Sequence, residues 1–332
     1  MEQKKVKKDY EAIFYIIILV AVISCAFAFI YYRTEYAEKY LIDYEYVFFD
    51  EGIANIVNLK TGYTSEIPIE EYCKNEQRSV IWIQTTDQKY GDKQRTVKEV
   101  CLTNELGKTQ VVFDTEYLWE NVGRTFIYDI ICTENGRIIF TAGDIKSDTY
   151  LFEYTNQKLV KLYDGEVYFH FSVNAKELIF RTIPDNYDEP GELRVLNLIE
   201  NTPSEHKAYG DYIVYLNDDE RLYFNRSNRL SVKQSVNSAN VTHMDYDPDS
   251  LEKGCIVPNR PPLVSEDGDI AIIYYVNSFG DPGLELHKMG IYYVDENKLI
   301  DINDYFKMVH NKKLDLDVVK HNKISAKLIS AD

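Results

Sequence analysis

The segment GRIIFTAGDIKSDTYLFEYTNQKLVKLY, Gly136–Tyr163, has the pattern that decides the fold. An apolar run is followed by a polar insert and then by a second apolar run, which is broken by a short polar turn near Gln157. Short runs of β-branched and aromatic residues bounded by turn residues are typical of strands. The segment therefore predicts consecutive antiparallel strands joined by turns.

The same unit recurs along the chain. Its turns centre near Gly62, Gly107, Gln157, Glu200 and Asn297, at intervals of 45, 50, 43 and 97 residues. The last interval is close to two of the others, so a degenerate unit is expected near Asp249. Six units of about 47 residues result, and a period in the forties with four short strands is the size of one propeller blade.

The predicted fold is all-β: a six-bladed β-propeller of four-stranded antiparallel blades over residues 44–310. A composition of 14% aromatic residues, with 28 tyrosines, agrees with a strand-rich chain. A pair of β-sandwiches is the structural alternative. The tail, residues 311–332, is expected either to supply a strand that closes the ring or to extend as a free end, with Ile324–Ile329 packed.

Four turn-and-strand segments resemble the TolB-like six-bladed β-propeller family. They are CTENGRIIF (Cys132–Phe140), SVNAKELIF (Ser172–Phe180), VSEDGDIAIIYY (Val264–Tyr275) and IANIVNLKTG (Ile53–Gly62). Gly136 and Gly268 keep the turn glycine, whereas Ala175 and Glu220 do not. The resemblance covers most of residues 44–310 and implies a binding scaffold more often than an enzyme.

The N-terminus predicts a membrane anchor. Residues 13–32 contain no charged side chain, and a helix of about 20 residues spans about 30 Å of hydrocarbon. Residues 1–12 contain the basic sequence KKVKK, so the positive-inside rule places them in the cytoplasm. Residues 33–43 are then a stalk, and the propeller lies outside the cytoplasm as part of a single-pass cell-membrane protein.

Two alternatives to an uncleaved anchor remain open. The sequence VISC, ending at Cys25, satisfies the loose residue classes of a bacterial lipobox, and AFA, ending at Ala28, satisfies a signal-peptidase pattern. The apolar run continues past both positions, which favours the anchor. All three interpretations place the repeat domain outside the cytoplasm.

The charge of the chain limits its partners. Four of the 37 basic and three of the 54 acidic residues precede the apolar segment, so the chain after it carries a net charge of −18. Such a surface repels nucleic acid and anionic headgroups, so neither is an expected partner. Solubility alone also explains an acidic surface.

Four predicted units carry a polar insert at the same point, between the second and third strands: Gln84–Arg95, Thr141–Thr149, Thr182–Glu192 and Val276–Gly290. Equivalent loops of successive blades emerge on one face, which would gather Asp87, Tyr90, Asp92, Asp144, Asp148, Asp185, Tyr187, Asp188, Glu189, Phe279 and Asp281. Acids beside aromatics suit a cationic protein segment or a sugar. The alternative is that Asp, Asn, Gly and Pro simply turn the chain.

No motif indicates catalysis, a cofactor or a metal. H-E-x-x-H, G-x-S-x-G and a phosphate-binding glycine loop are all missing from the sequence. His170 is interpreted as a core or channel-facing histidine rather than a catalytic one. The acids of Asp245–Glu252 superficially match a calcium loop, but Ser250 and Ile256 stand where glycine and glutamate are required.

The cysteines after the apolar segment, Cys73, Cys101, Cys132 and Cys255, match no zinc or redox spacing. They are interpreted as small buried hydrophobes, and disulfides remain open because the compartment permits them. The leading functional hypothesis is a non-enzymatic protein-binding or sensing module of the cell envelope. A carbohydrate- or cell-wall-binding receptor is second, and a glycan-cleaving enzyme with paired carboxylates is third.

Overall fold

The computed structural model describes most of the chain. The described residues are 18–28, 30–31, 34–35, 37–90, 93–133, 135–144, 148–184, 191–203, 212–215, 220–225, 230–235, 241–244, 256–258, 262–265, 267–277, 286–296, 298–310 and 326–330.

In the predicted anchor, residues 18–28 are helical and Cys25 is exposed. Across the part of the chain that the structure describes, no helix combines the length and the apolar character needed to span a bilayer. Residues 13–17, 29 and 32 of the predicted span lie outside the described residues. At the end of the predicted stalk, Tyr40 and Ile42 are buried in the core beside Tyr305.

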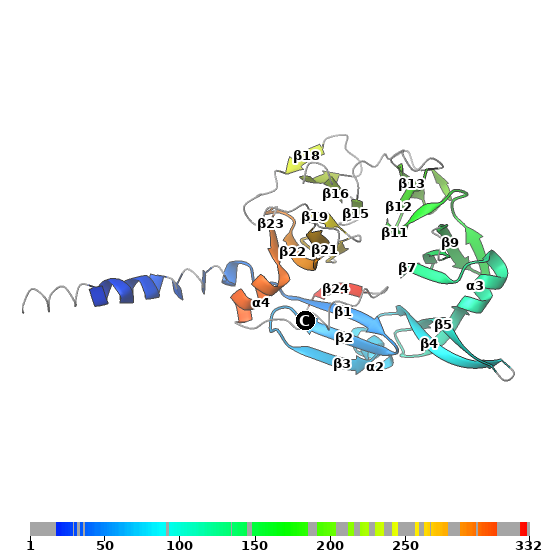
Figure 1. The fold of residues 1–332 in the computed structure, drawn as a ribbon, viewed down its shortest axis with the longest axis horizontal. Helices are drawn as coiled ribbons and strands as arrows, with labels where there is room; N and C mark the ends of the chain where they lie inside the picture. Colours follow the sequence, from blue (N-terminus) through cyan, green and yellow to red (C-terminus); the bar gives the residue numbers. More distant parts are fainter. Residues whose placement is uncertain are drawn as a thin grey trace, which may run out of the picture.

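The described strands form six antiparallel sheets arranged in a ring (Figure 1). The first sheet has the order β24 (Ala326–Ser330), β1 (Tyr44–Asp50), β2 (Ile53–Asn58), β3 (Thr64–Pro68), and the second is β4 (Val80–Tyr90), β5 (Lys93–Thr103), β6 (Thr109–Asp114). The third contains β7 (Phe126–Cys132), β8 (Ile138–Gly143), β9 (Tyr150–Thr155), β10 (Lys158–Lys161), and the fourth β11 (Val167–Val173), β12 (Glu177–Thr182), β13 (Leu193–Asn197), β14 (Thr202–Pro203).

The last two sheets complete the ring. The fifth contains β15 (Tyr212–Tyr215), β16 (Glu220–Asn225), β17 (Leu230–Ser235) and β18 (Val241–Met244). The sixth contains β19 (Ile256–Pro258), β20 (Leu263–Val264), β21 (Ile270–Asn277), β22 (Leu286–Tyr293) and β23 (Lys298–Asp301). Both β19 and β20 pair with β21, along different residues, so together they take the place of one strand.

The all-β propeller prediction is confirmed, but the number of complete blades is five rather than six. The second sheet has three strands, because the residues after β6 form helix α3 (Thr115–Val122) instead of a fourth strand. Asp114 caps this helix by accepting a hydrogen bond from the Tyr117 amide at 2.7 Å, and Gly123 ends it with φ 66°. Both are standard helix boundary signals.

The ring closes by pairing the two ends of the domain. The C-terminal strand β24 lies antiparallel to β1, from Tyr44 opposite Ser330 to Phe48 opposite Ala326. The first sheet therefore combines three strands from the N-terminal part with one from the predicted tail.

The core lies between neighbouring sheets, which explains why the strands read as continuous apolar runs. Ile139 and Phe140 are adjacent in β8 and both fully buried, yet they belong to different clusters. Phe140 packs with Ile81 and Phe113 of the second sheet, and Ile139 packs with residues of the fourth. Successive side chains of a strand point to opposite faces, so a strand covered on both faces needs apolar residues throughout.

The turns at Gly136 and Gly268 have the geometry that their sequences predict. Both glycines have positive φ, 75° and 79°, and their amides donate to the carbonyls of Thr133 and Ser265. The unit with Ala175 replaces the glycine turn by a side-chain contact. Asn174 Oδ1 accepts hydrogen bonds from the amides of Lys176 and Glu177 there, at 2.9 and 2.7 Å.

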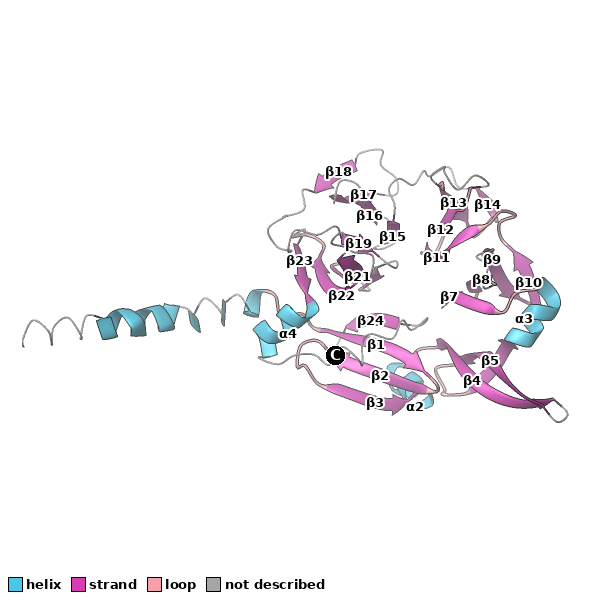
Figure 2. Cartoon of the chain, in the orientation of Figure 1, coloured by secondary structure: helices cyan, strands magenta, loops and turns pink. Residues whose placement is uncertain are grey.

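The described part of the propeller also contains three short helices. Helices α3 and α4 (Ile302–His310) lie on its outer side (Figure 2). Helix α2 (Ile69–Glu76) connects β3 to β4 and buries Ile69, Tyr72 and Cys73. Tyr305 of α4 donates a hydrogen bond to the carbonyl of Leu59, which fixes the helix on the first sheet.

Candidate functional site

Two neighbouring strands at the inner edges of the third and fourth sheets, β7 and β11, both contain bulges. In β7, Ile127 pairs with Ala142 and Asp129 with Thr141, so Tyr128 is an extra residue. In β11 the register shifts between Val167 and Phe171, so residues 168–170 oppose a single residue of β12. Bulges bend a strand and redirect its side chains, and they are common next to active and binding sites.

The bulges bring Asp129 and His170 together. Asp129 Oδ2 lies 3.4 Å from His170 Nδ1, and the two side chains keep 24% and 22% of their exposure. This contact joins two sheets and stays accessible to solvent. His170 is therefore a partly buried, partnered histidine on an inner strand, as its sequence context predicted.

Tyr128 connects the bulge of β7 to the insert Thr141–Thr149. Its hydroxyl donates a hydrogen bond to the carbonyl of Asp144 at 3.0 Å. Burial and the nearby negative charge of Asp144 raise the pKa of Tyr128, so it stays a neutral donor. The turn is tight here, because a Cβ on Gly143 would lie 2.8 Å from the carbonyl oxygen of Asp148.

Tyr168 and Arg181 form the corresponding contact in the fourth sheet. The guanidinium of Arg181 lies 5.4 Å from the ring centroid of Tyr168, and its Nε donates to the carbonyl of Gly191 at 3.2 Å. A hydrogen bond joins the two ends of the insert Thr182–Glu192: the Thr182 amide donates to the carbonyl of Glu192 at 2.8 Å.

We call these residues the insert-end cluster: Tyr128, Asp129, Asp144, Tyr168, His170 and Arg181. Tyr128, Asp144, Tyr168 and Arg181 lie near the beginning of a first strand or the end of a second strand, which is the same end of an antiparallel sheet. Asp129 and His170 lie at the middle of β7 and β11, next to the bulges. The inserts at Thr141–Thr149 and Thr182–Glu192 leave from the same end. Of the predicted site residues, Asp144 and Asp148 therefore lie at the cluster.

Asp87 and Tyr90 are placed differently from the prediction. The segment expected to be a polar loop after a second strand forms a long hairpin between the first two strands of its sheet, with Asp87 opposite Thr96 and Tyr90 opposite Lys93. The Thr96 hydroxyl donates to Asp87 at 3.0 Å. Successive turns of an antiparallel sheet alternate between its two ends. The first strands β4, β7 and β11 contact one another in order, so we infer that the Asp87 hairpin points to the opposite end.

The other predicted site residues lie outside the described residues: Asp92, Asp185, Tyr187, Asp188, Glu189, Phe279 and Asp281. So do Cys255 and the calcium-like segment Asp245–Glu252. The described residues contain no group of three or more His, Cys, Asp or Glu side chains that could hold a metal ion. Cys73, Cys101 and Cys132 are free thiols in the described part, and the first two are fully buried.

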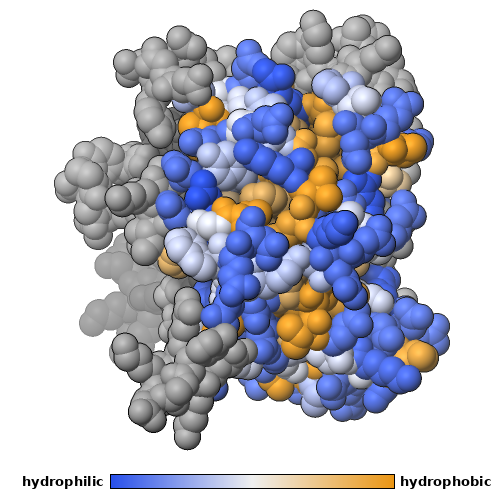
Figure 3. All heavy atoms as spheres, turned by 90° about the vertical axis from the view of Figure 1, so that its right-hand side faces the viewer, coloured by the Kyte–Doolittle hydropathy of each residue, from blue (hydrophilic) through white to orange (hydrophobic). Residues whose placement is uncertain are grey.

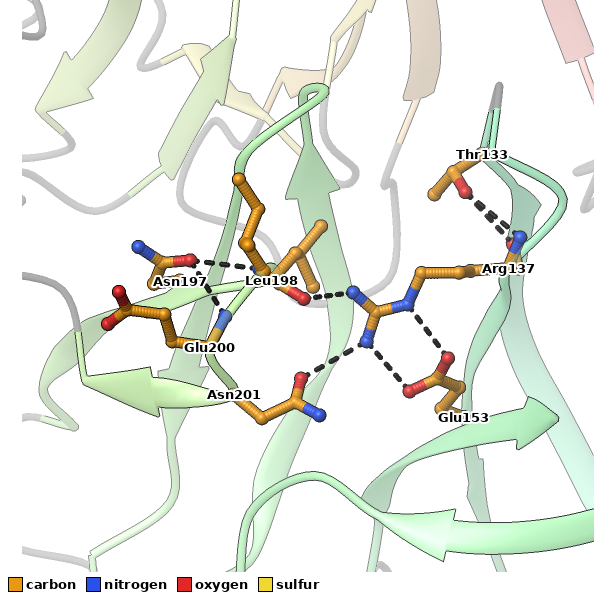
Figure 4. Close-up of polar contacts among 8 residues, drawn as sticks. Thr133, Arg137, Glu153, Asn197, Leu198, Glu200 and Asn201 are labelled. Atoms are coloured by element: carbon orange, nitrogen blue, oxygen red, sulfur yellow. Dashed lines mark hydrogen bonds and ion pairs between the residues drawn. The ribbon is translucent and has the colours of Figure 1, made fainter.

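Sequence reasoning missed a polar contact that joins the third and fourth sheets (Figure 4). Arg137 Nε and Nη2 donate to the two carboxylate oxygens of Glu153 at 2.8 and 2.7 Å. The same guanidinium reaches across to the carbonyl of Leu198 and, at 3.1 Å, to Asn201 Oδ1. The sequence feature that could have indicated this contact is Glu153, the only charged residue of strand β9.

The face on the right-hand side of Figure 1 has apolar patches between hydrophilic side chains (Figure 3). Among exposed apolar residues of the described outer elements, Trp119 on α3 and Val111 on β6 keep 54% and 53% of their exposure. Isolated exposed apolar side chains are common on soluble proteins. The insert-end cluster, which combines aromatic and charged groups on two bulged strands and the ends of their neighbours β8 and β12, is therefore the stronger candidate site.

No family model matches the sequence, and no curated protein matches it. Several solved structures are similar in fold. An uncharacterized protein of Listeria monocytogenes EGD-e is 11% identical with a TM-score of 0.36, over 65% of this chain and 62% of that one. The β-propeller domain of the Trilobed protease from Pyrococcus furiosus is 8% identical with a TM-score of 0.39, over 68% and 71%.

A puromycin-hydrolyzing peptidase of Mycobacterium tuberculosis is 9% identical with a TM-score of 0.42, over 76% of this chain and 42% of the peptidase. The chain therefore spans less than two thirds of the length of the Listeria protein and of this peptidase. The assignment of a propeller rests on the sheets, their ring and its closure by β24 and β1.

Proposed function

We propose that this protein is a membrane-anchored, extracytoplasmic β-propeller that binds a protein partner in the cell envelope without catalysing a reaction. The observation that carries the proposal is the insert-end cluster, to which the bulged strands β7 and β11 and the ends of β8 and β12 contribute tyrosines, an arginine and acidic groups. Tyrosine and arginine are enriched in the cores of protein interfaces. The resemblance of the turns to TolB-like blades supports a binding scaffold.

The expected partner carries a cationic segment. The chain after the apolar segment has a net charge of −18. Asp144 and Asp148 lie at the insert end, and Asp129 lies next to the bulge of β7. Complementary charge raises association rates and excludes like-charged competitors. Binding is then expected to weaken as salt rises.

Affinity purification from solubilised membranes tests this proposal. The full chain is expected to recover a reproducible partner, and Asp129→Asn and Asp144→Asn are expected to reduce its yield several-fold. Glu66→Gln removes an equal charge from the exposed strand β3 and serves as the matched control. Failure to recover a partner, or equal yields from all variants, would contradict the proposal.

The anchor is tested separately at the N-terminus. An uncleaved anchor predicts that the mature protein keeps residues 1–12 and stays in the membrane fraction after alkaline washing. Replacement of Cys25 by Ala is expected to leave both membrane retention and mass unchanged. Loss of a lipid mass in this variant would establish the lipoprotein alternative, and a mature N-terminus after Ala28 would establish release.

A carbohydrate ligand is the second candidate function, favoured by the exposed ring of Tyr168, which keeps 43% of its exposure beside Arg181. Aromatic rings with neighbouring polar groups also suit a sugar. Glycan-array binding that is lost in Tyr168→Ala would favour this alternative over a protein partner. A glycan-cleaving enzyme would in addition show turnover that disappears when one carboxylate is replaced.

A further inference from the structure

Two cationic side chains converge on one aromatic ring in the third sheet. The guanidinium carbon of Arg124 lies 4.8 Å from the ring centroid of Tyr150, and Lys161 Nζ lies 4.0 Å from the same centroid. Arg124 precedes β7, Tyr150 begins β9 and Lys161 ends β10, so all three lie at the insert end. Each contact with the ring is favourable, but these distances place the two charges within about 9 Å of each other, where like charges repel.

Neither cation has an acidic partner in the part of the chain that the structure describes. Among the described residues, no carboxylate lies within ion-pair distance of Arg124 or Lys161. The local charge at Tyr150 is therefore opposite in sign to that of the protein as a whole.

Most hydrogen-bond donors of the two cations have no partner in the described structure. Arg124 Nη1 donates to the carbonyl of Gly123 at 3.2 Å, and Lys161 Nζ donates to the carbonyl of Asp164 at 2.9 Å. A guanidinium has five N–H donors and an ammonium has three. Arg124 Nη2 and two donors of Lys161 thus remain for a ligand.

The position of Arg124 is also costly. Its Nε atom is buried and has no hydrogen-bond partner among the described residues. A buried polar atom without a partner destabilises the folded state, and such an atom in a native structure requires an explanation. The contact with Tyr150 offsets only part of this cost, which is consistent with a guanidinium held in place for binding.

We propose that Arg124 and Lys161 form an oxyanion site beside Tyr150, which takes a carboxylate or a phosphate group. Planar guanidinium groups match the oxygens of both anions, and bonds between charged partners are the strongest hydrogen bonds available to a side chain. An anion bound near both cations relieves their repulsion and uses their remaining donors. This site is independent of the proposed cationic partner and adds a second ligand chemistry to the same end of the propeller.

Phosphorus NMR of inorganic phosphate with the full chain tests the site. The phosphate signal is expected to broaden on addition of protein. Chloride keeps the ionic strength constant in all samples. Lys161→Gln and Arg124→Gln are expected to weaken phosphate binding by about tenfold or more, the usual effect of removing a charged hydrogen-bond donor. Lys158→Gln is the matched control, because Lys158 is an exposed lysine of the same strand with the same change in charge.

Acetate distinguishes the two ligand groups. Displacement of phosphate by acetate at equal ionic strength assigns the site to both anions, and no displacement assigns it to phosphate. Lys161 is exposed, so Lys161→Gln is expected to fold and carries the test even if Arg124→Gln does not. Unchanged phosphate binding in Lys161→Gln, or no binding by the original protein, would overturn the proposal and leave the cations with a packing role on Tyr150.

Discussion

Arg137 and Glu153 form a bidentate ion pair whose arginine also reaches the neighbouring sheet. The two N–O distances within the pair are 2.8 and 2.7 Å, and the guanidinium donates further to Leu198 and Asn201. The side chains keep 22% and 7% of their exposure, so the pair is largely removed from water. The hydrogen bonds to Glu153, together with its negative charge, raise the pKa of Arg137 further above its ordinary value.

Replacing Arg137 alone is expected to destabilise the protein strongly. Arg137→Met leaves the carboxylate of Glu153 buried without a partner, which costs about 3 kcal/mol of unfolding free energy. The double variant Arg137→Met, Glu153→Leu removes both charges and is expected to recover more than half of that loss. Urea unfolding measures both values, and a double variant that is no more stable than the single one would contradict this account.

The pair of Asp129 and His170 is expected to behave differently, because both side chains are partly exposed. His170→Gln should lower the free energy of unfolding by less than about 1 kcal/mol, the range of solvent-exposed ion pairs. The same variant should reduce recovery of the proposed partner. A loss of stability similar to that of Arg137→Met would identify His170 as a structural residue instead.

Two turn glycines with similar backbone angles predict different costs of substitution. Gly107 and Gly136 have φ of 69° and 75°. A Cβ on Gly136 meets no atom within 4 Å, whereas a Cβ on Gly107 would lie 2.5 Å from the carbonyl oxygen of Glu70.

Gly136→Ala is therefore expected to cost about 1–2 kcal/mol, the penalty of a left-handed conformation alone. Gly107→Ala should cost clearly more, because the backbone of α2 must also move. Comparison of the two variants by urea unfolding isolates the effect of the close approach, and equal losses would show that α2 yields without cost.

The regular parts of the fold could be predicted from the sequence. The spacing of the turns placed the hairpins at Gly62, Gly107 and Gln157, because turn geometry depends on local residues. Helix α3 was missed even though Asp114 and Gly123 are ordinary cap residues, because the expectation of a fourth strand concealed them. A repeat pattern predicts the average unit well and its exceptions poorly.

The candidate site was predictable only in part. Asp144 and its insert were identified, because polar inserts between strands are visible as composition. The contact of Asp129 with His170, 41 residues apart, depends on bulges in two different strands. Asp87 was assigned to the wrong end, because a hairpin after a first strand and one after a second strand have the same composition.

The buried cysteine thiols and tyrosine hydroxyl of the core predict a loss of stability at alkaline pH. Burial raises the pKa of Cys73 and Cys101 from 9.0 to about 11, and that of Tyr305 from 10.0 to about 12. These groups lose their protons earlier in the unfolded chain than in the folded protein. Their contribution is complete below pH 9 and is lost as pH rises through 9 to 11 for the thiols and 10 to 12 for Tyr305.

Urea unfolding between pH 8 and pH 11 measures this loss, which should be at most about 2 kcal/mol for each thiol. The variant Cys73→Ala, Cys101→Ala is expected to be less stable at pH 8, because it leaves space in the core. It should nevertheless lose less stability between pH 8 and pH 11 than the original protein, since it lacks both titrating thiols. Parallel pH profiles for the two proteins would show that these thiols do not cause the alkaline loss.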